Sequence, residues 1–199
     1  MKPETLLACI QAIDNLIGTK YHIHLGRAGK LAAFTITFKK EDVYHLMGLH
    51  YLQDRIDNRN RGKIFDALLT DPIYRHRIAS SSHWSEDLSN RVACATMLEK
   101  MLDDNSTVFR YNHKRLPFFS QIEAEYLLDN TSYGREVYLF IDKREDSDDR
   151  FCRSIFPKTT HDYSYGQAKW TLLYKKKHLP DGTEFVLYHN KNYVLPNAL

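Results

Sequence analysis

The feature of this sequence that most constrains its fold is a change of hydrophobic period near residue 107. Before it, apolar residues recur at helical spacing in several segments. After it, polar and apolar residues alternate as in strands. Six such strands are predicted, near residues 107–112, 122–129, 136–142, 150–156, 168–176 and 184–189. Because most connections between them are short, such as 130–135, we expect neighbouring strands to run antiparallel as a meander.

The chain before residue 107 combines helices with one early hairpin. A helix is predicted from Pro3, a residue type favoured in the first turn, to Gly18. Alternating residues then predict two strands, 21–25 and 31–38, joined by a glycine-containing turn. A polar break at 58–63 separates this region from further helices.

Three details of the later helices bear on the site. Residues 39–55 are predicted as one helix with Gly48 in its middle. A glycine there costs about 1 kcal/mol relative to alanine and marks a kink or the close approach of another backbone. Asp71 and Ser85 have side chains that suit N-caps, and the helix after Ser85 is predicted to run unbroken over 86–104.

Length and composition favour one domain of mixed structure. A chain of 199 residues with 43% hydrophobic residues suits a single domain with a sizeable core. We therefore predict an α+β fold in which a helical N-terminal half with an early hairpin packs on a C-terminal antiparallel meander sheet. The domain would comprise an N-terminal helix (1–20), the hairpin plus helices (21–106) and the sheet (107–195).

Charge and cysteine usage predict an ordinary intracellular environment. The formal net charge of +3 allows nucleic-acid binding through a local patch but does not require it. Cys9, Cys94 and Cys152 are far apart and show no CxxC spacing, so a disulfide framework is not expected. No apolar run approaches the ~18 residues that cross a bilayer. We expect a cytoplasmic protein with no membrane partner.

Common catalytic and nucleotide-binding motifs do not occur, so single residues have to be weighed. His45 comes soon after the strand 31–38, where an imidazole can act as general acid or base at a phosphodiester. The competing interpretation is that its ring only packs between strand and helix. His45 and His50, five apart in one helix, would point to different sides. His22 and His24 share a strand face without a third ligand, so no metal or other cofactor is predicted.

Cations, hydroxyls and aromatic rings interleave over residues 151–177. This composition suits phosphate binding and stacking on unpaired bases. Strict alternation puts Lys169, Thr171 and Lys175 on one polar strand face. An ordinary solvated sheet face has the same pattern, so both interpretations stay open. The triplet 175–177 is predicted as a solvated strand end.

Two parts of the sequence resemble a phage-associated branch of the barnase–EndoU–colicin–RelE-like (BECR) nuclease superfamily. The matching elements are His45, Leu46, Gly48 and Leu49 in the first part, and Ser154, Phe156, Pro157 and Tyr163 to Lys175 in the second. The resemblance covers about Tyr21 to His189. It implies a helical front on a curved antiparallel sheet, metal-independent RNase activity, and residence in phages or mobile elements. Domains of this kind act as toxins or as effectors against host defences.

The resemblance also implies a set of site residues. Carried over by position, His45 is the general acid or base, and phosphate contacts fall to Ser154, Lys169, Thr171 and Lys175. RNA-binding residues are further predicted at Arg153, Lys158, Tyr163 and Tyr165. No carboxylate stands out beside these residues, so the general base stays unassigned. The prediction requires His45 and the late lysines to line one hollow.

The sequence leaves two other functions open. One is a non-catalytic inhibitor that keeps the nuclease fold and binds a host defence protein or a ribonucleoprotein. The other is a structural or regulatory module. The expected partner is therefore RNA in the first case and a defence protein or ribonucleoprotein in the second.

Overall fold

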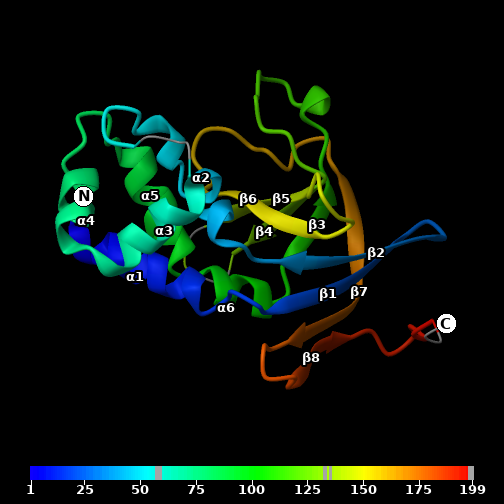
Figure 1. Ribbon diagram of the computed structural model, residues 1–199. Coiled ribbons are helices and arrows are strands. Elements are labelled where there is room, and N and C mark those ends of the chain that lie inside the picture. The colour runs from blue at the N-terminus through cyan, green and yellow to red at the C-terminus, as the bar shows by residue number, and fades with distance from the viewer. Residues whose placement is uncertain (57–59, 132–133, 135, 197–199) are drawn as a thin grey trace.

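The protein was analysed as a computed structural model that describes residues 1–56, 60–131, 134 and 136–196. It is an α+β structure in which most helices gather on one side of a large mixed sheet (Figure 1). The predicted polar break at 58–63 and turn at 130–135 fall partly on residues outside this range. In the part of the chain that is described, no helix is long and apolar enough to cross a membrane.

The helices begin where their capping residues predict. Helix α1 (Pro3–Asp14) starts at its proline but ends before Gly18, in a turn. The other main helices are α3 (Arg61–Thr70), α4 (Pro72–Ala79), α5 (Glu86–Ala95) and α6 (Leu98–Asp103). The Asp71 carboxylate accepts hydrogen bonds from the first amides of α4, and the Ser85 hydroxyl accepts one from α5. Both predicted caps are confirmed.

The predicted continuous helix over 86–104 is wrong, because α5 and α6 are separate. The chain leaves the helical conformation at Met97 (φ −107°, ψ 11°). One residue earlier, the Thr96 hydroxyl donates a hydrogen bond of 2.7 Å to the carbonyl of Ala93. Such a local side-chain bond competes with regular helix hydrogen bonding and often accompanies a bend.

Four consecutive strands form the predicted meander. They are β3 (Thr107–Arg110), β4 (Tyr126–Asn130), β5 (Val137–Lys143) and β6 (Arg150–Pro157), each antiparallel to the next. Every residue of β5 from Val137 to Ile141 is buried, which explains its unbroken apolar sequence. Helices and strands pack a large core on one face of the sheet, and a smaller aromatic cluster around Tyr138 and Phe140 covers the other.

The meander prediction fails at the seventh strand. Strand β7 (Ala168–His178) does not pair with β6 but with β3 and with β1 (Lys20–Arg27). Strand β2 (Lys30–Thr37) pairs with β1 and makes one parallel bridge to β6. The order of paired strands is therefore β1-β2-β6-β5-β4-β3-β7, and β7 pairs with β1 again. Strand β8 (Glu184–His189) extends β7 as a hairpin. The early hairpin is therefore part of the sheet, and the predicted separation into helical half and sheet half is only partly correct.

The predicted helix over residues 39–55 is also interrupted. It consists of a 3-10 turn (Lys40–Asp42), the single helical turn α2 (Val43–Leu46) and a second 3-10 turn (Leu49–Tyr51). Gly48 joins the last two in the left-handed conformation (φ 74°), which favours glycine. A Cβ at this position would lie 2.7 Å from a methyl group of Leu88 in α5. The kink that Gly48 predicts is therefore present, and the close neighbours are side chains rather than another backbone.

Candidate active site

The segment around α2 borders two adjoining hollows that share His45 and Arg153. The larger, here called the main cleft, has a volume of about 850 Å³, and the smaller, here called the side pocket, about 170 Å³. The main cleft is lined by Lys39, Glu41, Asp42, His45, Arg61, Glu123, Asp142, Lys143, Arg144, Glu145, Asp146, Phe151 and Arg153. The side pocket is lined by His45, His50, Tyr51, Arg91, Gln121, Ile122, Arg153 and Ser154.

Two imidazoles meet in the side pocket. The ring centres of His45 and His50 are 5.2 Å apart, and each ring is flanked by the preceding or following tyrosine. The prediction that these histidines point to different sides is wrong, because it assumed a continuous helix. The left-handed turn at Gly48 redirects the chain between them. Nδ1 of His50 is buried and has no hydrogen-bond partner among the described residues.

Four arginines line the same two hollows: Arg61, Arg91, Arg153 and Arg144, the last of which is held by Asp42. Nη1 of Arg91 donates a 2.6 Å hydrogen bond to the Ser154 hydroxyl, and its guanidinium lies 4.9 Å from the ring centre of Phe156. Nη1 of Arg153 donates to the Asp142 carboxylate at 2.7 Å. The Arg61 guanidinium lies over the ring of Tyr44. The aromatic contacts hold Arg61 and Arg91 in place without neutralising their charge, so an anion can bind here.

An irregularity in β6 brings Arg153 and Ser154 to one side. Consecutive strand residues normally point to opposite faces of a sheet. The register between β5 and β6 passes from Phe140 opposite Ser154 to Ile141 opposite Cys152, so Arg153 is an extra residue. A bulge of this kind re-aims a side chain and is common beside active sites. Both side chains therefore line the side pocket.

Burial and positive charge keep the two histidines neutral. Burial, followed by the charges of Arg61, His50 and Arg153, lowers the pKa of His45 to about 4. Burial, with the nearby Arg91 and Arg61, also lowers the pKa of His50, against a hydrogen bond with the Tyr44 backbone that acts to raise it. A neutral imidazole at pH 7 can accept a proton. A bound phosphate would offset the effect of the arginines and raise both pKa values.

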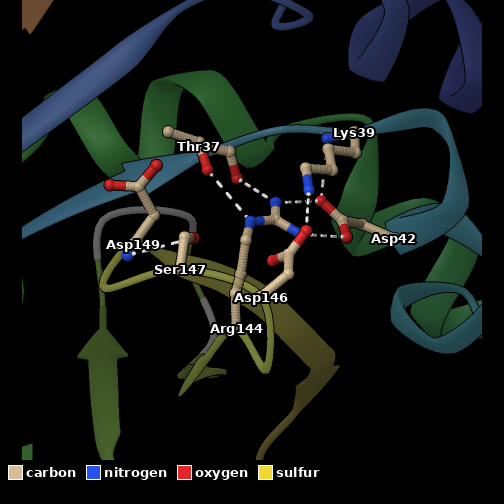
Figure 2. Close-up of polar contacts among 7 residues, drawn as sticks. All are labelled: Thr37, Lys39, Asp42, Arg144, Asp146, Ser147 and Asp149. Atoms are coloured by element: carbon tan, nitrogen blue, oxygen red, sulfur yellow. Dashed lines mark hydrogen bonds and ion pairs between the residues drawn. The ribbon is translucent and has the colours of Figure 1, made fainter.

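A buried arginine fixes the segment that carries His45 (Figure 2). The Arg144 guanidinium, in the β5–β6 turn, donates two hydrogen bonds to the Asp42 carboxylate, at 2.8 and 2.6 Å. It also donates to the hydroxyl and the carbonyl of Thr37, at the end of β2. The same Asp42 carboxylate accepts from the backbone amide of Lys39. Arg144 thus ties the wall of the main cleft to the chain just before α2, which orients His45.

The structure brings together three of the predicted site residues and separates the others. His45, Arg153 and Ser154 line the side pocket. Lys169 and Thr171 are exposed on β7, opposite Phe109 and Gly26, and they line neither hollow.

Lys175 corrects the prediction most clearly. It is only 4% exposed, and its ammonium group donates hydrogen bonds to the carbonyls of Leu102 and Asp104 at the end of α6. The register between β1 and β7 shifts at Leu173, so Lys175 shares a face with Leu172 rather than with Thr171. The face assignment for Lys175 is therefore wrong, because it assumed unbroken alternation.

The predicted solvated strand end at 175–177 is wrong for the same reason. Lys177 is buried beside Lys175 and pairs with Glu99 and Asp103, and only Lys176 points outward, toward Glu184. The inward lysines attach β7 to α6.

The remaining candidates for RNA contact lie outside the two hollows. Lys158 pairs with Glu136 at 2.8 Å, and Tyr165 is 61% exposed. Tyr163 packs in the aromatic cluster against Phe118 and Phe156. Burial raises the pKa of Tyr163, and the charge of Arg91 acts to lower it. Tyr163 is therefore close to Arg91, which lines the side pocket, but it does not line the pocket itself.

Sequence reasoning did not assign four of the residues that line the hollows, namely His50, Arg61, Arg91 and Glu123. His50 directly follows the element that carries the family resemblance but was expected to point away from His45, and the other three stand in segments that show no recognisable motif. Gly48 was the one available signal, since a left-handed residue would have placed His50 near His45. Glu123 supplies a carboxylate in the main cleft. Among the described residues, no group of three or more histidine, cysteine or carboxylate side chains is arranged to hold a metal ion.

Comparison with known protein families assigns the chain to a nuclease family. A model of the family described as phage-Barnase-EndoU-ColicinE5/D-RelE like nuclease4 matches residues 5–191. The chain belongs to this BECR-type nuclease family. Comparisons with curated proteins and with solved structures found no match. The family resemblance inferred from the sequence is confirmed.

Proposed function

We propose that the protein is a metal-independent endoribonuclease of a phage or mobile element, which acts in the cytoplasm as a toxin or an anti-defence effector. Membership of a BECR-type nuclease family supports nuclease activity. The single observation that carries the proposal is the convergence of His45 with His50, Arg91, Arg153 and Ser154 around one pocket. Two neutral imidazoles surrounded by guanidinium groups are suited to cleavage of a phosphodiester by its own 2′-hydroxyl.

In the proposed reaction His45 is the general base. It accepts the proton of the 2′-hydroxyl while the 2′-oxygen forms a bond to phosphorus. The bond between phosphorus and the 5′-oxygen breaks, and this oxygen takes a proton from His50, which the bound phosphate has helped to protonate. Arg91 and Arg153 stabilise the charge that develops on the phosphoryl oxygens. The products are a 2′,3′-cyclic phosphate and a 5′-hydroxyl.

The carboxylate of Glu123 is the alternative base. It lines the main cleft with His45, and a carboxylate and an imidazole could divide the same two proton transfers. Substitution of Glu123 by glutamine separates these assignments. If His45 is the base, Glu123→Gln retains most of the cleavage rate, whereas a loss similar to that of His45→Ala assigns the base to Glu123.

The proposal is tested with a DNA oligonucleotide that contains one ribonucleotide. Cleavage is expected only after the ribonucleotide, at the same rate in EDTA as in magnesium, with cyclic-phosphate products identified by mass spectrometry. His45→Ala should reduce kcat by about 100-fold or more. His76→Ala removes an exposed histidine of α4 and is the matched control. Cleavage of an all-DNA strand, or a requirement for magnesium, contradicts the mechanism.

Failure to cleave any RNA would favour the alternative function. In that case the cationic pocket serves a non-catalytic inhibitor that binds a ribonucleoprotein or a host defence protein. Binding of RNA without cleavage, lost in Arg153→Ala, would support the ribonucleoprotein as partner.

A further inference from the structure

A second cleft adjoins the main cleft on the other side of Glu123 and Asp142. This hairpin cleft has a volume of about 720 Å³. Its lining includes the turn between β1 and β2, the chain after β3 and the start of β7. Because Glu123 and Asp142 line both clefts, a strand bound at His45 can continue into the hairpin cleft without leaving the surface.

Two cations face each other at the rim of the hairpin cleft. Arg27 and Lys30 are paired across the tip of the β1–β2 hairpin, with only Ala28 and Gly29 between them. Like charges directly opposite on paired strands are destabilising. Neither side chain has an ion pair with a carboxylate among the described residues, and both are exposed. An anion held between them would remove the repulsion.

The hairpin tip is also conformationally unfavourable. Ala28 has φ 47°, and it is the one non-glycine residue with positive φ in the described part of the chain. The left-handed conformation costs a residue with a side chain about 1 kcal/mol. A two-residue hairpin turn requires this conformation at both central residues, and Gly29 (φ 76°) shares it. The tight turn keeps Arg27 and Lys30 close together at the cleft.

The opposite wall of the hairpin cleft is held rigidly. It carries His113 and Arg115, in a short 3-10 turn (His113–Arg115) that follows β3. The Gln167 side chain accepts a hydrogen bond from the backbone amide of Asn112 at 2.8 Å and donates one to its carbonyl at 3.2 Å. These two bonds fix the wall to the chain before β7. Arg115 is exposed and has no ion pair with a described carboxylate.

Aromatic rings lie between the two walls. Trp170, at the start of β7, and Tyr111 both line the hairpin cleft. Trp170 is only partly buried, so part of its ring is open to a ligand. Arg110 also lines the cleft but pairs with Glu125 at 3.0 Å, a carboxylate that it shares with Arg150, so it is less available to a ligand. Unpaired cations beside an accessible indole match the phosphates and bases of single-stranded nucleic acid.

We propose that the hairpin cleft binds the part of a single-stranded RNA that flanks the cleaved bond, with Arg27, Lys30 and Arg115 contacting its phosphates and Trp170 stacking on a base. This inference rests on the proposed ribonuclease function. The carboxylates of Glu123 and Asp142 lie between the two cationic clefts. A carboxylate can accept hydrogen bonds from ribose hydroxyls and from the amino groups of base edges. The two carboxylates would therefore contact ribose and bases, and they separate one phosphate site from the next.

Substrate length provides the test by cleavage. The wild-type protein should cleave a strand of about 12 nucleotides with a higher kcat/KM than one of about 3 nucleotides, because only the longer strand reaches both clefts. Arg27→Gln with Lys30→Gln should reduce kcat/KM about tenfold on the long strand, mainly through KM, and leave the short strand unaffected. Arg77→Gln with Lys191→Gln removes the same charge from exposed positions elsewhere and is the matched control.

A binding measurement keeps this inference distinguishable from the proposed function. Fluorescence anisotropy with a labelled, non-cleavable 2′-deoxy strand of the same sequence reports binding even when nothing is cleaved. The Arg27 and Lys30 double variant should bind more weakly, with a slope of log affinity against log salt that is shallower by about 1.4, because two phosphate contacts are lost. Unchanged binding, or an equal loss on short and long substrates, overturns the hairpin cleft as an RNA site. Weaker binding without any cleavage supports the cleft and contradicts only the nuclease mechanism.

Discussion

At the scale of single residues, the candidate site gathers basic groups whose positive charges repel one another. The pKa of His45 is lowered by the charges of Arg61, His50 and Arg153. Among the charges that act on His45, only that of Asp42 favours the protonated form. Burial acts in the same direction. Perturbed pKa values of this kind cluster at functional sites, because a site prepared for an anionic ligand concentrates positive charge before the ligand arrives. The protonation state of His45 is therefore a sensitive measure of whether the site binds phosphate.

The first residue-scale prediction concerns the titration of His45. In the free protein its ring should titrate near pH 4, as followed by NMR of labelled histidine, and inorganic phosphate should raise this pKa. Because the folded-state pKa lies below the unfolded value of about 6.5, the folded state binds fewer protons between these values. The stability contribution of His45 is present above pH 6.5 and is lost as the pH falls toward 4.

Two variants test the assigned cause. Arg153→Ala should raise the pKa of His45, because a neighbouring positive charge is removed, whereas Arg77→Ala on exposed α4 should leave it unchanged. Titration of His45 near its ordinary value in the wild-type protein would show that the ring is solvated, and would remove the electrostatic argument for the site.

At the scale of elements, the position of the site depends on two local departures from regular structure. The left-handed turn at Gly48 separates α2 from the following 3-10 turn, and the bulge at Arg153 interrupts β6. Each places two nearby residues on the same side, where a regular helix or strand would have separated them. Arg144 then holds the chain before α2 against the β5–β6 turn (Figure 2).

Substitution of Gly48 tests the first of these departures. Gly48→Ala should destabilise the protein by about 1–2 kcal/mol through backbone strain, with a further loss from overpacking against Leu88 and Arg91. Cleavage by the folded protein should also fall, because Arg91 lies in the side pocket. Gly182→Ala is the matched control, since Gly182 has a similar φ of 88° but an added Cβ would meet nothing within 4 Å. Equal unfolding free energies from urea titration of the two variants would contradict a steric role.

At the scale of the whole molecule, β7 decides the architecture. It pairs with β1, β3 and β8, and so joins the early hairpin to the meander. Its inward lysines attach the sheet to α6, where Lys175 donates to backbone carbonyls and Lys177 pairs with Glu99 and Asp103. Lys175, which the sequence suggests for phosphate binding, therefore serves the packing of the sheet on the helix.

The role of Lys175 can be separated from catalysis by measuring stability and activity together. Lys175→Met should lower the free energy of unfolding by about 1–3 kcal/mol, because the carbonyls of Leu102 and Asp104 lose a buried donor. The cleavage rate per folded molecule should not change. Lys176→Met is the control, since Lys176 forms only a surface ion pair with Glu184 and should have little effect on stability. A specific loss of cleavage in Lys175→Met would restore Lys175 to the active site.

The sequence by itself determined the strands of the second half, the capped starts of α4 and α5, the glycine kink at 48 and the nuclease family. These features depend on local periodicity, on single side chains that satisfy nearby backbone groups, or on motifs read in order along the chain. Only the tertiary structure decided which strands β7 pairs with, which way Lys175 points, and that His50 and Arg91 line one pocket with His45. A bulge shifts alternation by one residue for a reason that lies in the partner strand, and a convergence of distant side chains depends on long-range packing that no local pattern encodes.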